Sequence, residues 1–340
     1  MTFLAGLLAI EIKAGAPNNG RGEDNVAMVK STRVGNQTYP YVSAQALRRW
    51  WRDSLPTDES RSPVYRSGKG TNQQAYTAGR GDRFLDDDLF GYMIAEKSES
   101  YNRDTVLAVG TAVAVAPRVI TRDFGTMNRG FEIGANPVIH EHQHYTADVA
   151  SPVLLDLPRV GTFEYEGRGN RPDLSAAALE EARAEGAVEV EFRDTKAIQL
   201  PLVERRRRVA VLLRTLAQLR GGAKQSLHYG ERSPALFVVA PMKGGNNPFT
   251  RVIAAEAGLT VVDTGVLREE ITAWADELDG PVLLGWAPGF LREKRELARE
   301  ELAELIADGT VRFEHPRVLL RGLAEEIERG EHDVWFEDAV

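Results

Sequence analysis

The stretch that decides the fold covers residues 9–52 and reads AIEIKAGAPNNGRGEDNVAMVKSTRVGNQTYPYVSAQALRRWWR. An apolar strand runs into a loop rich in Asn, Gly and Arg, and the chain then enters a helix with arginines along one side. The loop and the helix supply amide and guanidinium donors that suit phosphate oxygens, and no group arranged for catalysis stands among them. The stretch therefore predicts a platform for a phosphate backbone and favours nucleic-acid binding over enzyme chemistry.

The helix in this stretch has two distinct sides. Ser43 is a favourable N-cap, and Leu47, Trp51 and Leu55 recur at helical spacing on the apolar side. With a period of ~3.6 residues, the residues on the opposite side share an arc of about 100°. They are Gln45, Arg48, Arg49 and Arg52. A solvated arginine face gives the same pattern, so it is the adjacent Asn/Gly loop that favours a binding role.

The chain has 340 residues and no cysteine. Its length is that of one elaborated domain or two modest ones. The lack of cysteine excludes a disulfide scaffold, a thiolate zinc site and a cysteine nucleophile, and it fits a reducing cytoplasm. The apolar N-terminal run closes at Glu11 and is too short to span a bilayer, and no other run approaches membrane length.

The net charge of −8 is unevenly distributed. Residues 1–245 carry 32 Lys and Arg against 29 Asp and Glu, whereas residues 246–340 carry 10 against 21. The first part is thus +3 and the second −11, which sum to −8. Because local basic surface decides phosphate binding, this distribution permits RNA binding in residues 1–245 despite the acidic total.

The pattern of elements predicts an α+β fold with an RRM-like (ferredoxin-like βαββαβ) palm. Apolar and β-branched runs predict strands over 3–13, 105–121, 150–163, 188–200 and 235–240, and helical patterns cover 43–55, 174–185 and 201–220. We expect the palm to span 1–245, with a polar finger or web insertion at 56–103 and a hairpin-like excursion at 122–137. Residues 246–340, with helices expected at 266–278 and 291–307, form an acidic and mainly helical extension packed on the palm.

Three histidines alternate in the sequence HEHQH, at His140, His142 and His144. Alternate residues of a strand face one side, so the imidazoles could ligate a metal, contact RNA or form plain strand surface. The helical HExxH pattern of zinc hydrolases does not occur anywhere in the chain. The three interpretations therefore stay open.

Three further motifs have both a functional and a structural interpretation. In GGAKQS, Gly221 and Gly222 allow close backbone approach to a phosphate, although a glycine-capped connection between helix and strand explains them equally. The four arginines at 205–208 cover a full helical turn, so flanking or solvated roles are expected for them. The three aspartates at 86–88 indicate the acidic first turn of a helix.

Four segments, in order, resemble the DevR-type backbone subunit of type I CRISPR Cascade complexes, with the I-A and I-B branch nearest. They are LLAIEIKAGAPNNGRGEDN (7–25), YPYVSAQALRRWWRD (39–53), NPVIHEHQHYTADVASPVLLDLPRVGTF (136–163), and GGAKQS (221–226) before SPALFVVA (233–240). Together they cover most of residues 1–245. Residues 246–340 match less clearly.

The resemblance implies a hand-shaped, non-catalytic protein of the prokaryotic cytoplasm that serves antiviral defence. Copies associate along the CRISPR guide RNA, the guide pairs with a target DNA strand, and other Cascade subunits join the complex. A β-hairpin thumb at about 122–143 kinks the guide, and no cofactor, metal or membrane is implied. With the histidines of the predicted strand, the expected RNA-binding residues are Asn18, Asn19, Arg21, Asn25, Ser43, Gln45, Arg48, Arg49, Arg52, Phe124, Met127, Arg129, His142, His144, Gly221, Gly222, Lys224 and Gln225.

Two enzymatic alternatives remain. Backbone subunits of the related type III complexes cut RNA with an acid in a loop near the thumb, and Asp123 stands where such an acid is expected. A metal-dependent enzyme built on HEHQH is the other alternative. We therefore expect no catalytic residue, while keeping an RNA-guided or metal-dependent ribonuclease as the second hypothesis.

Overall fold

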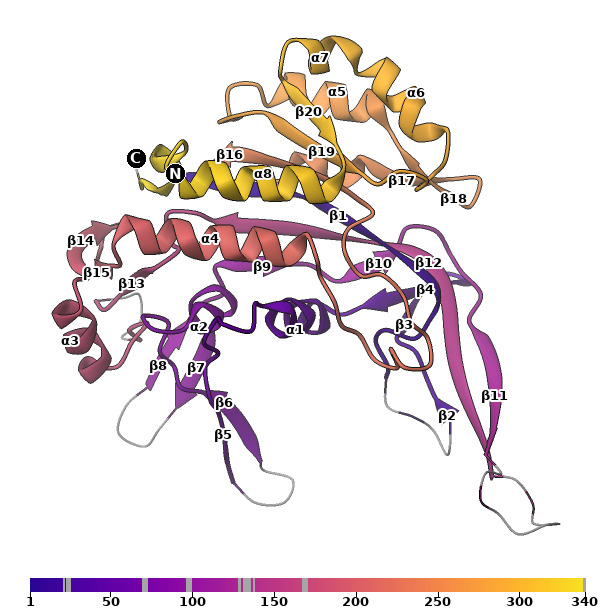
Figure 1. Cartoon of the computed structure of the whole chain (residues 1–340), viewed down its shortest axis with the longest axis horizontal. Helices are drawn as coiled ribbons and strands as arrows, with labels where there is room; N and C mark the ends of the chain where they lie inside the picture. The colour runs from indigo at the N-terminus through magenta and orange to yellow at the C-terminus, as the bar shows by residue number, and fades with distance from the viewer. Residues whose placement is uncertain are drawn as a thin grey trace.

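A computed structural model describes residues 1–20, 22, 26–68, 73–95, 100–127, 130, 136, 138–166 and 171–338, with the backbone alone for Met127. The expected RNA-binding residues Arg21, Asn25 and Arg129 lie outside this part. The described chain has a mixed α+β fold built on one large mixed sheet (Figure 1).

Strand β1 (Thr2–Gly15) lies in the middle of this sheet. It pairs antiparallel with β12 (Val138–Asp156) on one side and with β16 (Leu236–Lys243) on the other. The other edge of β12 pairs antiparallel with two short strands, β9 (Leu107–Val109) and β10 (Ala112–Ala114). The order across the sheet is therefore β16, β1, β12, then β9 and β10.

The sheet continues beyond these strands toward the hairpin that projects from the body. β10 pairs with β4 (Gln37–Val42), which pairs with β3 (Ser31–Val34). The outer half of β12 pairs antiparallel with β11 (Thr121–Met127) and parallel with β2 (Val26–Ala27). The β11–β12 pair forms the long projecting arm in Figure 1, at the place where the hairpin-like excursion was expected.

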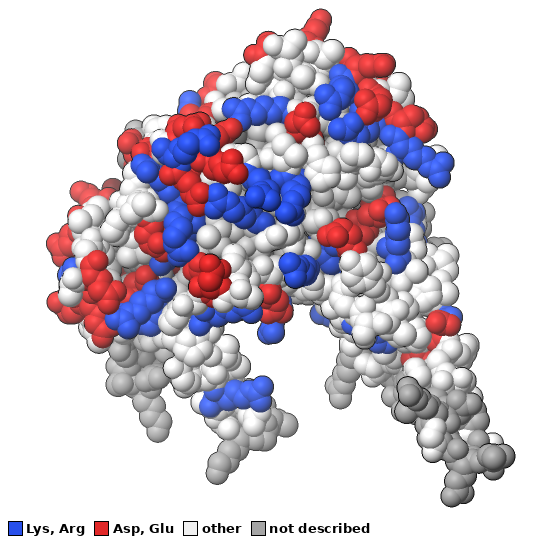
Figure 2. All heavy atoms as spheres, viewed as in Figure 1, with Lys and Arg blue, Asp and Glu red and all other residues white. Residues whose placement is uncertain are grey.

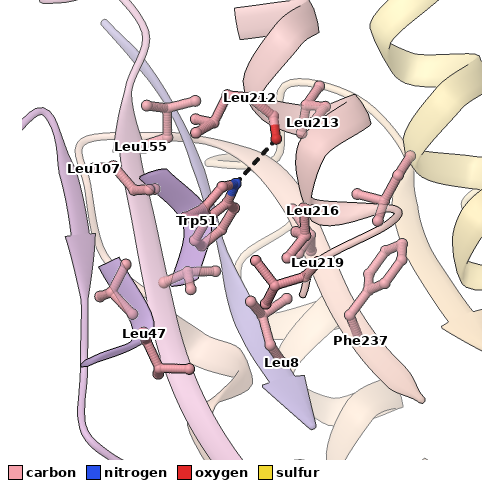
Figure 3. Packing of buried hydrophobic residues seen from close by; sticks show 14 of the residues in the cluster. Leu8, Leu47, Trp51, Leu107, Leu155, Leu212, Leu213, Leu216, Leu219 and Phe237 are labelled. Carbon is pink, nitrogen blue, oxygen red and sulfur yellow. Dashed lines mark hydrogen bonds between the residues drawn. The ribbon is translucent and has the colours of Figure 1, made fainter. Parts of the chain in front are cut away.

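Successive side chains of β1 point to opposite faces of the sheet, and each face has its own apolar core. Leu4 and Leu8 belong to one apolar cluster, and Ala5 and Leu7 belong to the other. The first cluster also contains residues of α1 (Ala44–Ser54), α4 (Leu202–Leu216) and α8 (Pro316–Glu328). Trp51 of α1 joins two of these helices, because its indole Nε1 donates a 3.1 Å hydrogen bond to Leu212 O of α4 (Figure 3).

The C-terminal residues extend the main sheet. β19 (Val282–Trp286) pairs antiparallel with β16, and β20 (Val311–Glu314) pairs parallel with β19. The remaining elements are β17 (Ile253–Glu256), β18 (Leu259–Val262), α5 (Thr264–Ala273), α6 (Lys294–Glu301) and α7 (Ala303–Ala307). The expectation of a mainly helical extension packed on the palm is therefore incomplete, because these residues also add two strands to the sheet.

The described residues between 56 and 103 form small elements beside and below α1 in Figure 1. They are β5 (Val64–Ser67), β6 (Gln74–Thr77), α2 (Leu85–Phe90), β7 (Tyr92–Ala95) and β8 (Ser100–Arg103). A second group consists of β13 (Thr162–Glu164), α3 (Ala176–Ala184), β14 (Val188–Phe192) and β15 (Thr195–Gln199). The aspartates at 86–88 occupy the first turn of α2, as predicted.

The four arginines of α4 contradict the prediction of flanking or solvated roles. Arg205 and Arg208 are buried. Arg205 donates to the carbonyls of Pro158, Val160 and Phe336, and Arg208 donates to Asp88 Oδ2 at 2.7 Å. Arg206 pairs with Asp333, and Arg207 pairs with Glu59 at 2.6 Å. Because α4 is covered on several sides by other parts of the chain, all four arginines hold elements together.

Candidate nucleic-acid interface

Three segments meet at one place: the loop after β1, the N-terminal end of α1, and residues 221–228, which we call the Gly-rich loop. Ser43 N donates a 2.9 Å hydrogen bond to Asn18 Oδ1, and Ala223 N donates a 2.8 Å bond to Pro17 O. We call the meeting place of residues 17–20, 43–52, 140–144 and 221–228 the junction. Its pieces are distant in sequence, and the sequence analysis named expected RNA-binding residues in each of them.

The first two pieces of the junction are fixed by local hydrogen bonds. Ser43 is the N-cap of α1, and its Oγ accepts a 3.4 Å hydrogen bond from Ala46 N. Asn18 therefore orients the helix end, while Asn19 pairs with Val29 as an isolated bridge. The buried Asn19 Oδ1 has no hydrogen-bond partner among the described residues. Because this acceptor is also buried, only an ordered water or a donor group that enters the loop would satisfy it.

Close packing explains why glycine occupies positions 221 and 222 of the Gly-rich loop. Gly221 has φ +127°, and a Cβ there would lie 2.9 Å from Cγ of Trp50. Gly222 has φ +94°, and its Cβ would lie 3.2 Å from Cβ of Pro17. The pair thus lets the loop lie flat on Trp50 and Pro17, two residues that the sequence analysis did not single out.

Gln225 shapes the loop from within. Its side-chain amide donates to Gly221 O, and its Oε1 accepts a 3.4 Å hydrogen bond from Gly230 N. Gln225 is one of the expected RNA-binding residues, and in this arrangement its amide group is engaged within the loop. Lys224 has φ +54°. Unlike the Gln225 amide, its ammonium group is not engaged within the loop, and no described carboxylate pairs with it.

A fourth histidine joins the three of the predicted strand. His228 of the Gly-rich loop packs on β12, with ring centroids 5.0 Å from His142 and 5.4 Å from His144. Both ring nitrogens of the buried His142 lack a hydrogen-bond partner in the described chain. Burial lowers the pKa of His142, and the nearby Lys224 cation lowers it further. The sequence signal for His228 was only its position in the Gly-rich loop.

The histidines do not form a metal centre in the described part of the chain. No group of three or more His, Asp or Glu side chains there has an arrangement that could hold a metal ion. The rings of His140 and His142 are instead stacked along the strand, with centroids 6.4 Å apart. Imidazole rings in this arrangement suit stacking and hydrogen bonding to a nucleotide.

The arginines of α1 have separate roles. Arg49 pairs with Asp53 of the same helix at 2.7 Å. Arg52 lies 3.3 Å from the buried Asp86 and 5.2 Å from the Phe90 ring centroid, so it ties α1 to α2. Arg48 has no ion-pair partner among the described residues, and Gln45 is exposed. Of the predicted arginine stripe, Arg48 is the guanidinium left available.

Unpaired cations gather around the junction. Within the part of the chain that the structure describes, no carboxylate pairs with Lys30, Arg48, Arg220 or Lys224. Elsewhere many cations are neutralised by carboxylates, and Figure 2 shows the two charges interleaved over the body. The unpaired cations can therefore bind phosphates without breaking an ion pair.

The projecting hairpin carries apolar side chains into solvent. Phe124 on β11 is exposed, and so are Val138 and Ile139 on β12. Figure 2 shows few charged residues on the described part of this hairpin. An exposed aromatic on a two-stranded arm suits insertion between bases, whereas the side chain of Met127 lies outside the described atoms.

The chain was compared with known proteins. No family model matches it, and no curated protein matches it. Its fold matches chains of solved structures over nearly the whole length. A chain described as "CRISPR RNA-guided surveillance complex, pre-nicking" aligns with TM-score 0.55 and 12% identity, covering 96% of this chain and 100% of that one. A chain of a "CRISPR RNA-guided surveillance complex" aligns with TM-score 0.52 and 15% identity, covering 95% and 98%.

Among the described residues, no helix is long and apolar enough to cross a membrane. At these levels of identity the structural match concerns the fold. What the junction binds therefore has to be argued from its own residues.

Proposed function

We propose that this protein is a non-catalytic backbone subunit of a CRISPR Cascade complex. It binds the guide RNA, associates with further copies along that RNA and supports pairing of the guide with a target DNA strand. It acts beside other Cascade subunits in antiviral defence, in the cytoplasm of a prokaryote. The likeness of fold to chains of CRISPR RNA-guided surveillance complexes supports the class of assembly.

The strand order supports an RRM-like palm. In a βαββαβ unit the fourth strand lies beside the first, and the third strand lies between the first and the second. β16, β1, β12, and β9 with β10 follow this antiparallel order, and α1 and α4 stand at the two helix positions. The finger or web then corresponds to residues 56–103, and the thumb corresponds to the β11–β12 hairpin.

The observation that carries the proposal is the junction itself. The loop after β1, α1 and the Gly-rich loop contact one another there, and no described carboxylate pairs with the neighbouring cations Lys30, Arg48 and Lys224. Phosphates, sugars and base faces are common to every guide, so a surface that binds them serves any guide sequence. The exposed Phe124 supplies an apolar wedge at the hairpin.

The test is co-expression of the chain with a guide locus, followed by purification. We expect RNA of uniform length in the purified material, and imaging should show a curved stack of identical subunits on that RNA. Protein recovered free of RNA under these conditions would contradict the proposal. A co-expressed Arg48→Glu variant should carry less RNA, because the change reverses charge at a phosphate contact.

One contact favours the alternative hypothesis that the protein is a ribonuclease. Asp123 Oδ2 lies 3.4 Å from His142 Nε2, and Asp123 is exposed on β11. A carboxylate beside an imidazole is an arrangement that acid–base cleavage uses. The test is RNA cleavage with added magnesium by the wild type and by Asp123→Asn. Cleavage that disappears in the variant would support the ribonuclease, and equal persistence of RNA with both proteins would exclude it.

A further inference from the structure

A cavity of about 520 Å³ lies behind the Gly-rich loop. The segment that connects α4 to β16 forms one wall, and the N-terminal end of α8 forms the other. The residues that define its chemistry are Arg220, Tyr229, Arg232, Pro316, Arg317 and Leu320. Its volume falls within the range of small-ligand sites, which is roughly 300–1,000 Å³.

Arg232 is buried in this wall without adequate partners. Only 2% of its surface is exposed, and its guanidinium lies 6.0 Å from the ring centroid of Trp50. Nη1 donates a 2.8 Å hydrogen bond to Glu231 O, but Nε has no partner among the described residues. A buried guanidinium with unmet donors is costly unless an acceptor reaches it, so the cavity favours an anionic ligand.

Two exposed cations reinforce this preference. Arg220 and Arg317 pair with no described carboxylate, and Nη1 of Arg317 donates a 3.3 Å hydrogen bond to Ala217 O. The one carboxylate in the wall, Glu231, accepts hydrogen bonds from Ser233 Oγ and from the backbone N of Arg232 and Ser233. All three bonds go to Oε1, so the carboxylate is held within its own turn, and it forms no ion pair with a described arginine of the wall. The guanidinium groups of Arg220 and Arg317 are exposed to a phosphate, and that of Arg232 lies buried in the same wall.

An aromatic ring stands at the same cavity. Tyr229 is 86% exposed, which is unusual for so large an apolar ring. Such a ring is a platform on which any base can stack. An acidic peptide would satisfy the guanidinium groups but would leave this ring in water, so the combination favours a nucleotide.

We propose that this cavity binds one nucleotide of a single-stranded RNA, with its phosphate on Arg220, Arg232 and Arg317 and its base on Tyr229. The proposal rests on the proposed function, because Gly221 and Gln225 belong both to the junction and to the cavity wall. An RNA strand that follows the Gly-rich loop can therefore place one nucleotide in the cavity.

The test uses the full chain and a mixed-sequence single-stranded RNA that carries 4-thiouridine. Binding is measured across a salt series, and cross-linked peptides are mapped by mass spectrometry. The combined variant Arg220→Glu with Arg317→Glu should bind about tenfold more weakly. Its slope of log Kd against log salt should fall by about 0.7, which corresponds to one phosphate of a single strand. Arg321→Glu is the matched control, because Arg321 is an exposed arginine of α8 outside the cavity wall, and it should behave as wild type.

Tyr229 gives the second readout. Tyr229→Ala should abolish the cross-link to residues 217–234, and Tyr229→Phe should retain it. The proposal is overturned if wild-type protein binds RNA without a cross-link there, which would leave the proposed function standing. It is also overturned if the double variant lowers self-association but not RNA binding, because a protein segment would then fill the cavity.

A further outcome concerns the kind of ligand. If 4-thiouridine monophosphate cross-links to residues 217–234 and the RNA does not, the cavity binds a free nucleotide and the proposal is overturned. Wild-type protein that binds no RNA would refute the proposed function as well.

Discussion

At the scale of single residues, the fold depends on charges that are buried in pairs. Asp88 receives hydrogen bonds from Arg103 at 2.6 Å, from Arg208 at 2.7 Å and from Gly161 N at 2.9 Å. Arg103 also reaches Asp173 at 2.5 Å. These groups join the insertion at 56–103 to α4 and, through Gly161, to the turn that follows β12. Removing one charge leaves the others buried without compensation.

We expect Asp88→Asn to lower the free energy of unfolding by about 3–5 kcal/mol, because it leaves two buried guanidinium groups without their shared carboxylate. Chemical denaturation measures the change. Asp53→Asn removes an exposed partner of Arg49 and should cost about 0–1 kcal/mol. Equal losses of unfolding free energy in the two variants would show that the buried cluster stabilises the fold no more than an exposed ion pair does.

His142 makes stability depend on pH. Burial and the Lys224 cation lower its pKa below the usual 6.5. The unfolded chain therefore binds more protons below about pH 6.5 than the folded chain does. The stabilisation is complete above that pH and is lost as the pH falls through the folded pKa. Free energies of unfolding measured between pH 7.5 and 5.5 should fall in the wild type and fall less in His142→Gln.

His140→Gln is the matched control for this change, because His140 is on the same strand but exposed. It should keep the pH dependence of the wild type. The titratable groups that face His142 are Asp123, His140, His144, Lys224 and His228. A His142→Gln profile identical to wild type would show that His142 does not cause the pH dependence.

At the scale of elements, the Gly-rich loop is held against α1 by its lack of side chains. Gly221→Ala should lower the free energy of unfolding by about 1–3 kcal/mol, because of the positive φ and the contact with Trp50. Gly186→Ala separates the two causes, since Gly186 has φ +103° and no neighbour within 4 Å of its Cβ position. A loss at Gly186 equal to that at Gly221 would exclude a role for the Trp50 contact.

Arg48→Glu should weaken binding of single-stranded RNA and reduce the salt slope by about 0.7, because it removes an unpaired cation from the junction. Fluorescence anisotropy across a salt series measures both quantities. Lys294→Glu, an exposed and unpaired cation of α6, should bind as wild type does. Equal affinity of the Arg48→Glu variant at every salt concentration would mean that α1 faces solvent in the complex.

Elements with a strong local signal could be predicted from the sequence. β1 has its alternation, α4 has a proline at its start, and the hairpin has its glycines. The partners of Arg205 and Arg208 could not be predicted, because they depend on carbonyls and carboxylates far away in the chain. By contrast, the contact between the Asn/Gly loop and α1 was predictable, because these two segments are close in the sequence. The packing of His228 on β12 was not.

At the scale of the whole molecule, residues 246–340 complete the sheet. They supply β19 beside β16, and they cover one face of β1 with Phe249, Leu267 and Trp286. The last strand predicted from the sequence was residues 235–240. β19 was not predicted, because it is a short apolar run in which polar and apolar residues do not alternate. Its burial on both faces becomes evident only when its neighbours are known.

A chain cut after residue 245 should therefore not fold on its own. It would leave β16 as an open edge and expose the apolar cluster on that face of β1. We expect it to be recovered as aggregate, with circular dichroism of any soluble part showing little ordered structure. A truncated chain that stays monomeric and unfolds cooperatively would show that residues 1–245 are an independent domain.

The central position of β1 has a consequence for synthesis in the cell. Its neighbours in the sheet, β12 and β16, are translated long afterwards, and β16 ends at residue 243. At ribosomal speeds of about 5–20 residues per second, the first strand waits on the order of ten seconds or more for both partners. Such long-range pairing makes folding slow and leaves an apolar segment open to wrong contacts. Nascent chains should therefore need a chaperone at the ribosome, and ribosome profiling with a chaperone pull-down can measure how long that protection lasts.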